Sequence, residues 1–148
     1  MREIFYALRF TGQATPAGPD GNVLHASTSS PSATITSEVG VDGLTGTIAG
    51  VAGDDARFTS EVTFTSETDF LETGTITFGA GNTLTFSTVG SGYLAPSADP
   101  SRKHGTVMWK VDSGAGQFAG ATGLITSNFF VDDQLGVIDH HFGVLLVP

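Results

Sequence analysis

Three consecutive residues near the end of the sequence, Asp139, His140 and His141 in GVIDHHFGVLLVP (136–148), could take part in acid–base chemistry. Neighbouring side chains on a strand point to opposite faces, so the two histidines cannot bind the same metal ion. Asp139 and His141 share a face, where they could form a carboxylate–imidazole pair or a weak metal site. Few other ligand types accompany them, and we predict no metal and no cofactor.

The two faces of this strand differ in composition, and this difference indicates which of the two histidines points inward. The set that contains His140 and Phe142 is bulkier and more uniformly apolar than the set that contains Asp139 and His141. We expect the first set to line the interior, where burial favours the neutral imidazole and lets His140 act as a base. The alternative is a histidine that is hydrogen-bonded in the core or placed at a subunit interface.

Three further residues could assist such a base. Tyr6 lies on the apolar face of the first strand, which pairs with the last strand when a meander closes, so its hydroxyl could orient a substrate near His140. Asn128 and Ser127 lie on opposite faces of ITSNFF, and an inward Asn128 could polarise a carbonyl. Glu38 is an acid within an otherwise neutral strand, and it could exchange a proton with a substrate if it faced inward.

Aromatic side chains on apolar strand faces could form the walls of a binding site. Trp109 is the only tryptophan of the chain, and its alternative role is that of a core residue. The expected substrate-binding residues are Phe64, Trp109, Phe129 and Phe142.

The elements that must position these residues are strands. Period-two alternation is strong, as in RFTSEVTFTSET (57–68), whereas the spacing typical of helices is almost absent. Short links rich in Gly, Asn and Asp, such as 79–82 and 131–136, indicate hairpins. We predict strands near 3–11, 32–39, 43–51, 56–66, 71–79, 82–94, 104–112, 123–131 and 136–147.

Two segments, 15–31 and 95–104, are rich in Pro, Gly and Ser and are predicted to be long loops. About eight strands with one apolar and one Thr-rich face predict an all-β fold, an up-and-down antiparallel β-barrel that spans 1–148 as one domain. A β-sandwich is the alternative.

The composition limits the partners. Fifteen acidic and six basic residues give a net charge of −9, which disfavours nucleic acid and anionic membrane surfaces. The chain has no cysteine, no apolar run that could span a bilayer and no signal-peptide pattern in MREIFYALRF. We expect a cytoplasmic protein. An outward-facing apolar strip on the last strand would suit a homo-oligomer.

The glycines of SGAGQFAGATGLITSNFF (113–130) do not form a dinucleotide fingerprint. Gly114, Gly116 and Gly120 depart from G-x-G-x-x-G by one residue, and a β-branched, aromatic strand follows where a helix is required. The glycines are therefore expected to turn the chain between strands.

The same segment, with Gly114, Gly116, Phe118, Gly120 and Gly123, resembles the G-x-G-x-F-x-G-x-x-G turn of allene oxide cyclases and the related dirigent proteins. The match covers about the last third of the chain. The resemblance implies an eight-stranded antiparallel barrel with a largely apolar cavity, in a dimer or trimer. It also implies the steering of reactive organic intermediates toward cyclised or coupled products.

Three functions remain open at this point. The first is a cofactor-independent isomerase, cyclase or lyase that confines a small apolar organic molecule and uses acid–base groups. The second is a carrier that binds a lipophilic ligand without chemistry. The third is a barrel filled with side chains, which the volume of the cavity would distinguish from the other two.

Overall fold

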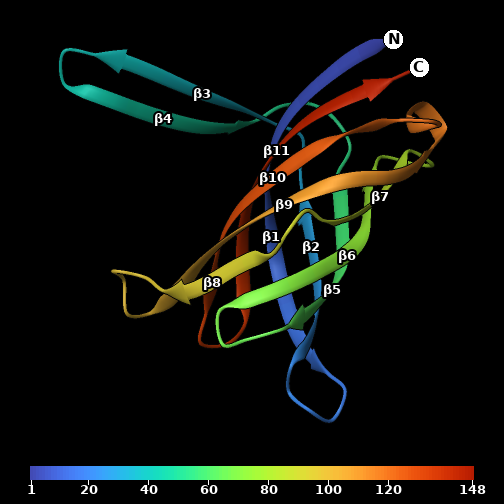
Figure 1. Cartoon of the computed structure of the whole chain (residues 1–148). Coiled ribbons are helices and arrows are strands. Elements are labelled where there is room, and N and C mark those ends of the chain that lie inside the picture. Colours follow the sequence, from blue (N-terminus) through green and yellow to red (C-terminus); the bar gives the residue numbers. More distant parts are fainter.

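Strands account for most of the computed structural model, which describes residues 1–148 (Figure 1). The one helical element is a short 3-10 turn, η1 (Gly116–Phe118). The strands are β1 (Arg2–Ala17), β2 (Val23–Ser30), β3 (Ala33–Gly40), β4 (Gly43–Gly50), β5 (Ala56–Phe64), β6 (Asp69–Phe78), β7 (Thr83–Thr88), β8 (Gly92–Pro96), β9 (Arg102–Ala115), β10 (Thr122–Asp132) and β11 (Gly136–Val147).

Eight antiparallel strands close a barrel in the order β1-β2-β5-β6-β7-β9-β10-β11, and β11 returns to pair with β1. The pairing of the first and last strands runs from Arg2 opposite Val147 to Gln13 opposite Gly136. β8 is an extra strand that pairs with β9 and with the start of β6, so it extends the position of β7. The predicted all-β antiparallel barrel is therefore confirmed, and the sandwich is not formed.

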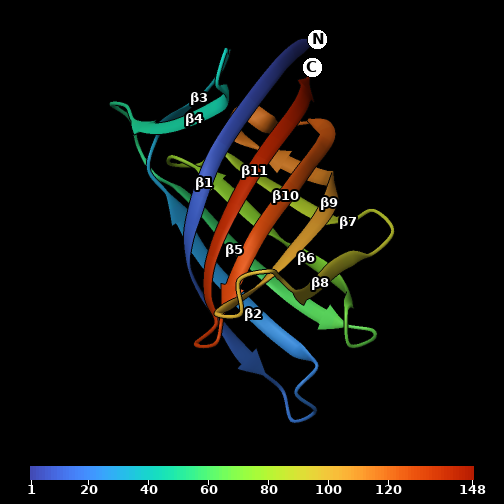
Figure 2. The same cartoon turned by 90° about the vertical axis from the view of Figure 1, so that its left-hand side faces the viewer.

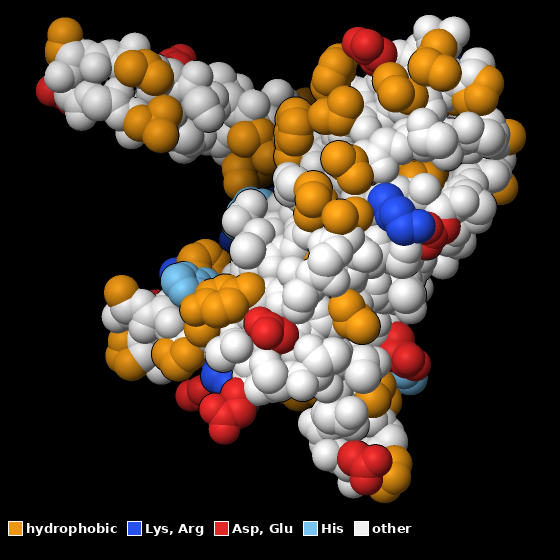
Figure 3. Space-filling view, in the orientation of Figure 1, with side chains coloured by type: hydrophobic (Ala, Val, Ile, Leu, Met, Phe, Trp, Pro, Cys, Tyr) orange, Lys and Arg blue, Asp and Glu red, His pale blue; other side chains and the backbone are white.

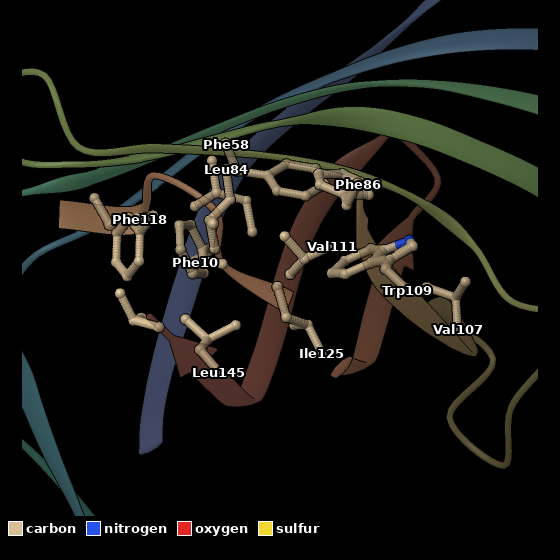
Figure 4. Packing of buried hydrophobic residues seen from close by; sticks show 14 of the residues in the cluster. Phe10, Phe58, Leu84, Phe86, Val107, Trp109, Val111, Phe118, Ile125 and Leu145 are labelled. Atoms are coloured by element: carbon tan, nitrogen blue, oxygen red, sulfur yellow. The ribbon is translucent and has the colours of Figure 1, made fainter. Parts of the chain in front are cut away.

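Alternation along the strands explains which side chains fill the barrel. On β5, Phe58 and Ser60 are buried whereas Thr59 and Glu61 are exposed, because successive side chains point to opposite faces. Aromatic rings dominate the interior, among them Phe118, Phe58, Phe86 and Trp109 (Figure 4). The fully buried large side chains are Phe10, Phe70, Ile76, Leu84, Phe86, Trp109, Ile125, His141 and Leu145.

The glycine-rich segment turns the chain, as expected. Gly116, Gly120 and Gly123 have φ values of 66°, 74° and 145°, which L side chains rarely adopt. At Gly116 a Cβ would also lie 2.4 Å from the carbonyl oxygen of Gly81. The turn directs Phe118 into the end of the barrel near the chain termini, where it packs edge-on against Phe78.

β3 and β4 lie outside the barrel, although the sequence suggested no such separation. They form their own two-stranded sheet and project from the barrel as an arm (Figures 1 and 2). The arm continues the β2–β5 pair past the links 31–32 and 51–55, where the chain bends away from the barrel. Residues of β3 and β4 therefore cannot line the barrel interior.

Two other predictions of elements are wrong in part. The segment 15–31 is no long loop, because β1 extends to Ala17 and β2 pairs with it from Val23. The predicted strand 82–94 is two strands, interrupted at 89–91. The chain forms no helix with the length and hydrophobicity needed to cross a bilayer.

Candidate active site in the barrel

A cavity of about 340 Å³ lies in the half of the barrel away from the chain termini. Its walls are mostly apolar, and aromatic rings from β5, β6 and β10 form a large part of them. The exposed residues Lys103, Asp132 and Asp133 lie at its rim. The principal wall residues are Phe58, Val62, Phe64, Phe70, Leu94 and Phe129.

Glu72 of β6 brings a carboxyl group into this apolar cavity. The hydroxyl of Ser60 donates a hydrogen bond to its Oε1 over 2.6 Å, and the indole Nε1 of Trp109 donates to its Oε2 over 3.1 Å. Burial raises the pKa of Glu72 to about 8; the negative charge of Asp139 adds to this rise, and the hydrogen bonds from Ser60 and Trp109 oppose it. Glu72 is therefore mostly protonated at neutral pH.

Asp139 of β11 places a second carboxyl group in the same cavity. The Ser127 hydroxyl donates to its Oδ1 over 2.6 Å, and its Oδ2 lies 2.9 Å from the Nε2 of His141. The predicted carboxylate–imidazole pair is thus present in the structure.

Aromatic rings hold the imidazole of His141 in place. It stacks on Phe10 at a centroid distance of 4.2 Å and meets Phe58 and Trp109 edge-on at 5.3 and 5.0 Å. Its Nδ1 is buried and has no hydrogen-bond partner. The ring is fixed by packing on its faces and edges, and only Nε2 is engaged with a carboxylate.

The two carboxyl groups give the cavity complementary proton-transfer groups. A carboxyl group that keeps its proton and a second carboxyl group in the same cavity can serve as donor and acceptor in one reaction. Glu72 offers a proton at neutral pH, and Asp139 is held by two partners in one orientation. The buried Oγ1 of Thr28 also lines the cavity and has no partner, so it is free to contact a bound molecule.

Four of the predicted site residues lie outside the barrel interior. His140, Asn128 and Phe142 are on the outer face of the barrel, because the opposite set of β10 and β11 points inward. The expectation that His140 and Phe142 line the interior is therefore wrong, and Ser127 occupies the inward position that we assigned to Asn128. Glu38 is exposed on the arm and does not reach the barrel interior.

The other four predicted residues are inside the barrel. Phe64 and Phe129 line the cavity, and Trp109 supports it through the hydrogen bond to Glu72. Tyr6 points inward as expected but does not line the cavity; its ring packs edge-on against Phe78 at 5.1 Å. Burial, and then the charge of Asp139, raise the pKa of Tyr6, and its hydroxyl has no partner.

Sequence reasoning missed Glu72, the carboxyl group on which the site depends. The signal was present, because Glu72 shares a strand face with Phe70, Ile76 and Phe78 and is the one charged member of that set. A charged residue at an apolar position of a strand is rarely buried without a partner. Ser60 could have been found in the same way, because it follows Phe58 on an apolar face.

No group of three or more His, Asp or Glu side chains lies close enough to hold a metal ion. The polar groups in the cavity are instead two hydrogen-bonded carboxyl groups and neighbouring hydroxyls.

Comparison with known proteins supports the fold and leaves the chemistry open. No protein-family model and no curated protein sequence matches the chain. Among solved structures, the pterocarpan synthase dirigent protein GePTS1 matches with a TM-score of 0.52 and 14% identity over 99% of this chain and 89% of that chain. The pterocarpan synthase dirigent protein PsPTS1 matches with a TM-score of 0.54 and 13% identity over 99% and 95% of the two chains.

The chain therefore has the barrel fold of dirigent proteins, as the glycine-rich segment predicted. At these identities the similarity concerns the fold alone.

Proposed function

We propose that this protein is a cofactor-independent isomerase, cyclase or lyase that acts on a small, apolar organic molecule in the barrel cavity. The observation that carries this proposal is the pair of carboxyl groups, Glu72 and Asp139, in a cavity that is otherwise mostly apolar. Burying two carboxyl groups among aromatic rings costs free energy, whereas a fully apolar core would avoid this cost. Such groups are common where proton transfer is the task.

Glu72 is the proton donor in this proposal. Its raised pKa keeps the proton on the carboxyl group at neutral pH, so it can protonate a developing oxyanion or a leaving group. Asp139 is the acceptor, and Ser127 and His141 hold its carboxylate in place. One proton leaves the substrate, one enters it, and transfer from Asp139 to Glu72 then restores the starting state without an external reagent.

The cavity supports the substrate class. A volume of about 340 Å³ suits a small organic molecule, and the aromatic walls favour an apolar body with a few polar groups. The dirigent proteins that share the fold are described as pterocarpan synthases, which fits a cyclisation of a confined intermediate. A carrier that binds the same molecules without converting them is the alternative.

The test joins binding to turnover. The purified protein is screened by thermal shift against small apolar hydroxyl- and carbonyl-bearing compounds, and each ligand is then incubated with the protein and analysed by mass spectrometry and chiral chromatography. A ligand at a hundred times its Kd adds about 2.7 kcal/mol of stability. Conversion of a bound compound is the expected result.

Two variants separate enzyme from carrier. Glu72→Gln and Asp139→Asn keep the shape of the cavity, so we expect ligand binding to persist while kcat falls about 10²- to 10⁴-fold. Glu61→Gln, an exposed acid on β5, is the matched control and keeps full activity. Binding with no conversion favours the carrier, and conversion that survives both substitutions contradicts the assigned roles.

A further inference from the structure

The arm formed by β3 and β4 has one apolar and one polar face. Cross-strand pairs place Ile35 opposite Ile48, and Val39 opposite Leu44, on the same face. The other face carries threonines and Glu38. We call the first set the apolar face of the arm; its members are Ala33, Ile35, Val39, Leu44 and Ile48.

The apolar face of the arm is most exposed at its outer end, whereas β3 contacts β1 of the barrel and Ala33, where β3 begins, is half-buried. Val39 and Leu44 are 85% and 72% exposed, and the space-filling view shows hydrophobic side chains along the projecting arm (Figure 3). A two-stranded hairpin in water is marginally stable at best unless its apolar side packs against something. The arm therefore needs a surface that this chain does not provide to itself.

A second uncovered apolar surface lies on the barrel. Outward-facing side chains of β1, β10 and β11 sit next to one another, because Phe5 pairs with Val144, and Val144 with Leu124. Figure 3 shows hydrophobic side chains gathered on the upper barrel beside the base of the arm. We call this surface the outer patch; its members are Phe5, Leu124, Phe142, Val144 and Leu146.

We propose that the arm of one chain packs its apolar face onto the outer patch of a second copy of the same chain. Both surfaces are apolar, both are unpartnered, and both are present on every chain. The arm projects away from its own barrel, so its exposed outer residues Val39 and Leu44 are placed to meet a neighbour's patch (Figure 1). When the contact is reciprocal, two copies cover all four surfaces.

The size of the contact is sufficient for a specific assembly. Eight residues per strand give the arm a length of about 26 Å, and two strands with their side chains give a width of about 10 Å. One face is then roughly 260 Å², and four such surfaces bury about 1,000 Å², the lower limit for a specific interface.

The charges on the arm are compatible with this contact. Its only charged residues are Glu38, on the polar face, and Asp42, in the turn between β3 and β4. Packing the apolar face therefore buries no unpaired charge, which would be costly. A chain with a net charge of −9 is a poor partner for an anionic membrane, so a second copy fits the arm better than a bilayer does.

The assembly leaves the proposed active site open. The arm leaves the barrel near the end that holds both termini, whereas the rim of the cavity is formed by the β10–β11 turn at the other end (Figure 1). A failure of this proposal would therefore say nothing against the proposed acid–base chemistry, and the reverse also holds.

The first experiment measures mass in solution by light scattering during gel filtration. We expect the natural chain to run at twice 15.2 kDa or more, and an armless variant, with residues 34–49 replaced by an Asn-Gly turn, to run as a single chain. Val39→Glu on the arm and Phe5→Glu on the patch should have the same effect. Thr36→Glu, on the polar face of the arm, is the matched control and should leave the mass unchanged.

A second experiment tests which surfaces meet. The chain has no cysteine, so Ile48→Cys on the arm of one sample and Leu124→Cys on the patch of another can be joined by a bismaleimide after mixing. We expect arm-to-patch products, and almost none when Thr36→Cys replaces the arm variant. A single-chain mass for the natural protein, an oligomer that persists without the arm, or products that join arm to arm would overturn the proposal.

Discussion

Glu72 shows how a single side chain is set by opposing effects. Burial disfavours its charged form, and the negative charge of Asp139 does so as well. Hydrogen bonds from Ser60 and Trp109 favour the carboxylate, but they do not cancel the effect of burial. The result is an acid whose pKa is about 8, well above the 4.5 of an exposed glutamate.

This titration can be observed through the only tryptophan of the chain. Because Trp109 donates its indole hydrogen to Glu72, its emission should change when the carboxyl group ionises. We expect a fluorescence transition with a midpoint near pH 8, the pKa of Glu72, and its loss in Glu72→Gln. The measurement is an emission titration from acid to alkaline pH, with Glu61→Gln as a control that keeps the transition. The same midpoint in Glu72→Gln would show that another group is responsible.

At the scale of the element, the composition of β11 explains why the sequence predicted only some of the residues that lie inside the barrel. Both of its faces are apolar over their last residues, so alternation alone could not say which face is inside. The more apolar face points outward, and its residues Phe142, Val144 and Leu146 belong to the outer patch. The inner face carries Asp139 and His141, which are buried there and bonded to Ser127 and to each other.

The close pairing of β1 and β11 gives a steric prediction. A Cβ at Gly143 would lie 2.1 Å from Cε1 of Tyr6, so the ring of Tyr6 covers this glycine. We expect Gly143→Ala to lower the free energy of unfolding by about 1–3 kcal/mol through overpacking, measured by urea denaturation. In a Tyr6→Ala background the same substitution should cost little.

The control for this prediction is another strand glycine. Gly50 at the end of β4 has open space around its Cα, so Gly50→Ala should change stability by less than about 0.5 kcal/mol. An equal cost of Gly143→Ala with and without the Tyr6 ring would show that the contact is not the cause.

At the scale of the whole molecule, Glu72 couples folding to pH. Its pKa is raised in the folded state, so between about pH 4.5 and 8 the unfolded chain has released this proton while the folded chain keeps it. The folded state binds more protons, and stability therefore falls as pH rises through this window and levels off above it. Below the ordinary pKa of a glutamate the penalty is absent.

We expect the free energy of unfolding to differ between the natural chain and Glu72→Gln, by an amount that depends on pH. Relative to the natural chain, Glu72→Gln should be more stable at pH 8, by a few kcal/mol, and about equally stable at pH 4.5, because Gln never ionises. Denaturant unfolding at a series of pH values measures this, and the difference removes the contributions of acids such as Asp99 and Asp112, whose pKa values are lowered in the fold. A constant difference across the pH range would contradict the assignment.

The sequence by itself determined the class of fold, the turn at 113–123 and the inward faces of β1, β5 and β9. These follow from local rules, since period-two alternation and positive φ at glycine do not depend on distant residues. The resemblance carried by Gly114, Gly116, Phe118, Gly120 and Gly123 was likewise confirmed by the shared barrel fold.

Only the tertiary structure decided which side of β10 and β11 faces inward, that β3 and β4 leave the barrel, and that Glu72 and Asp139 share one cavity. The physical reason is that these features depend on how the sheet closes. Glu72 and Asp139 are 67 positions apart in the sequence, and only closure of the barrel through β9, β10 and β11 brings both into one cavity.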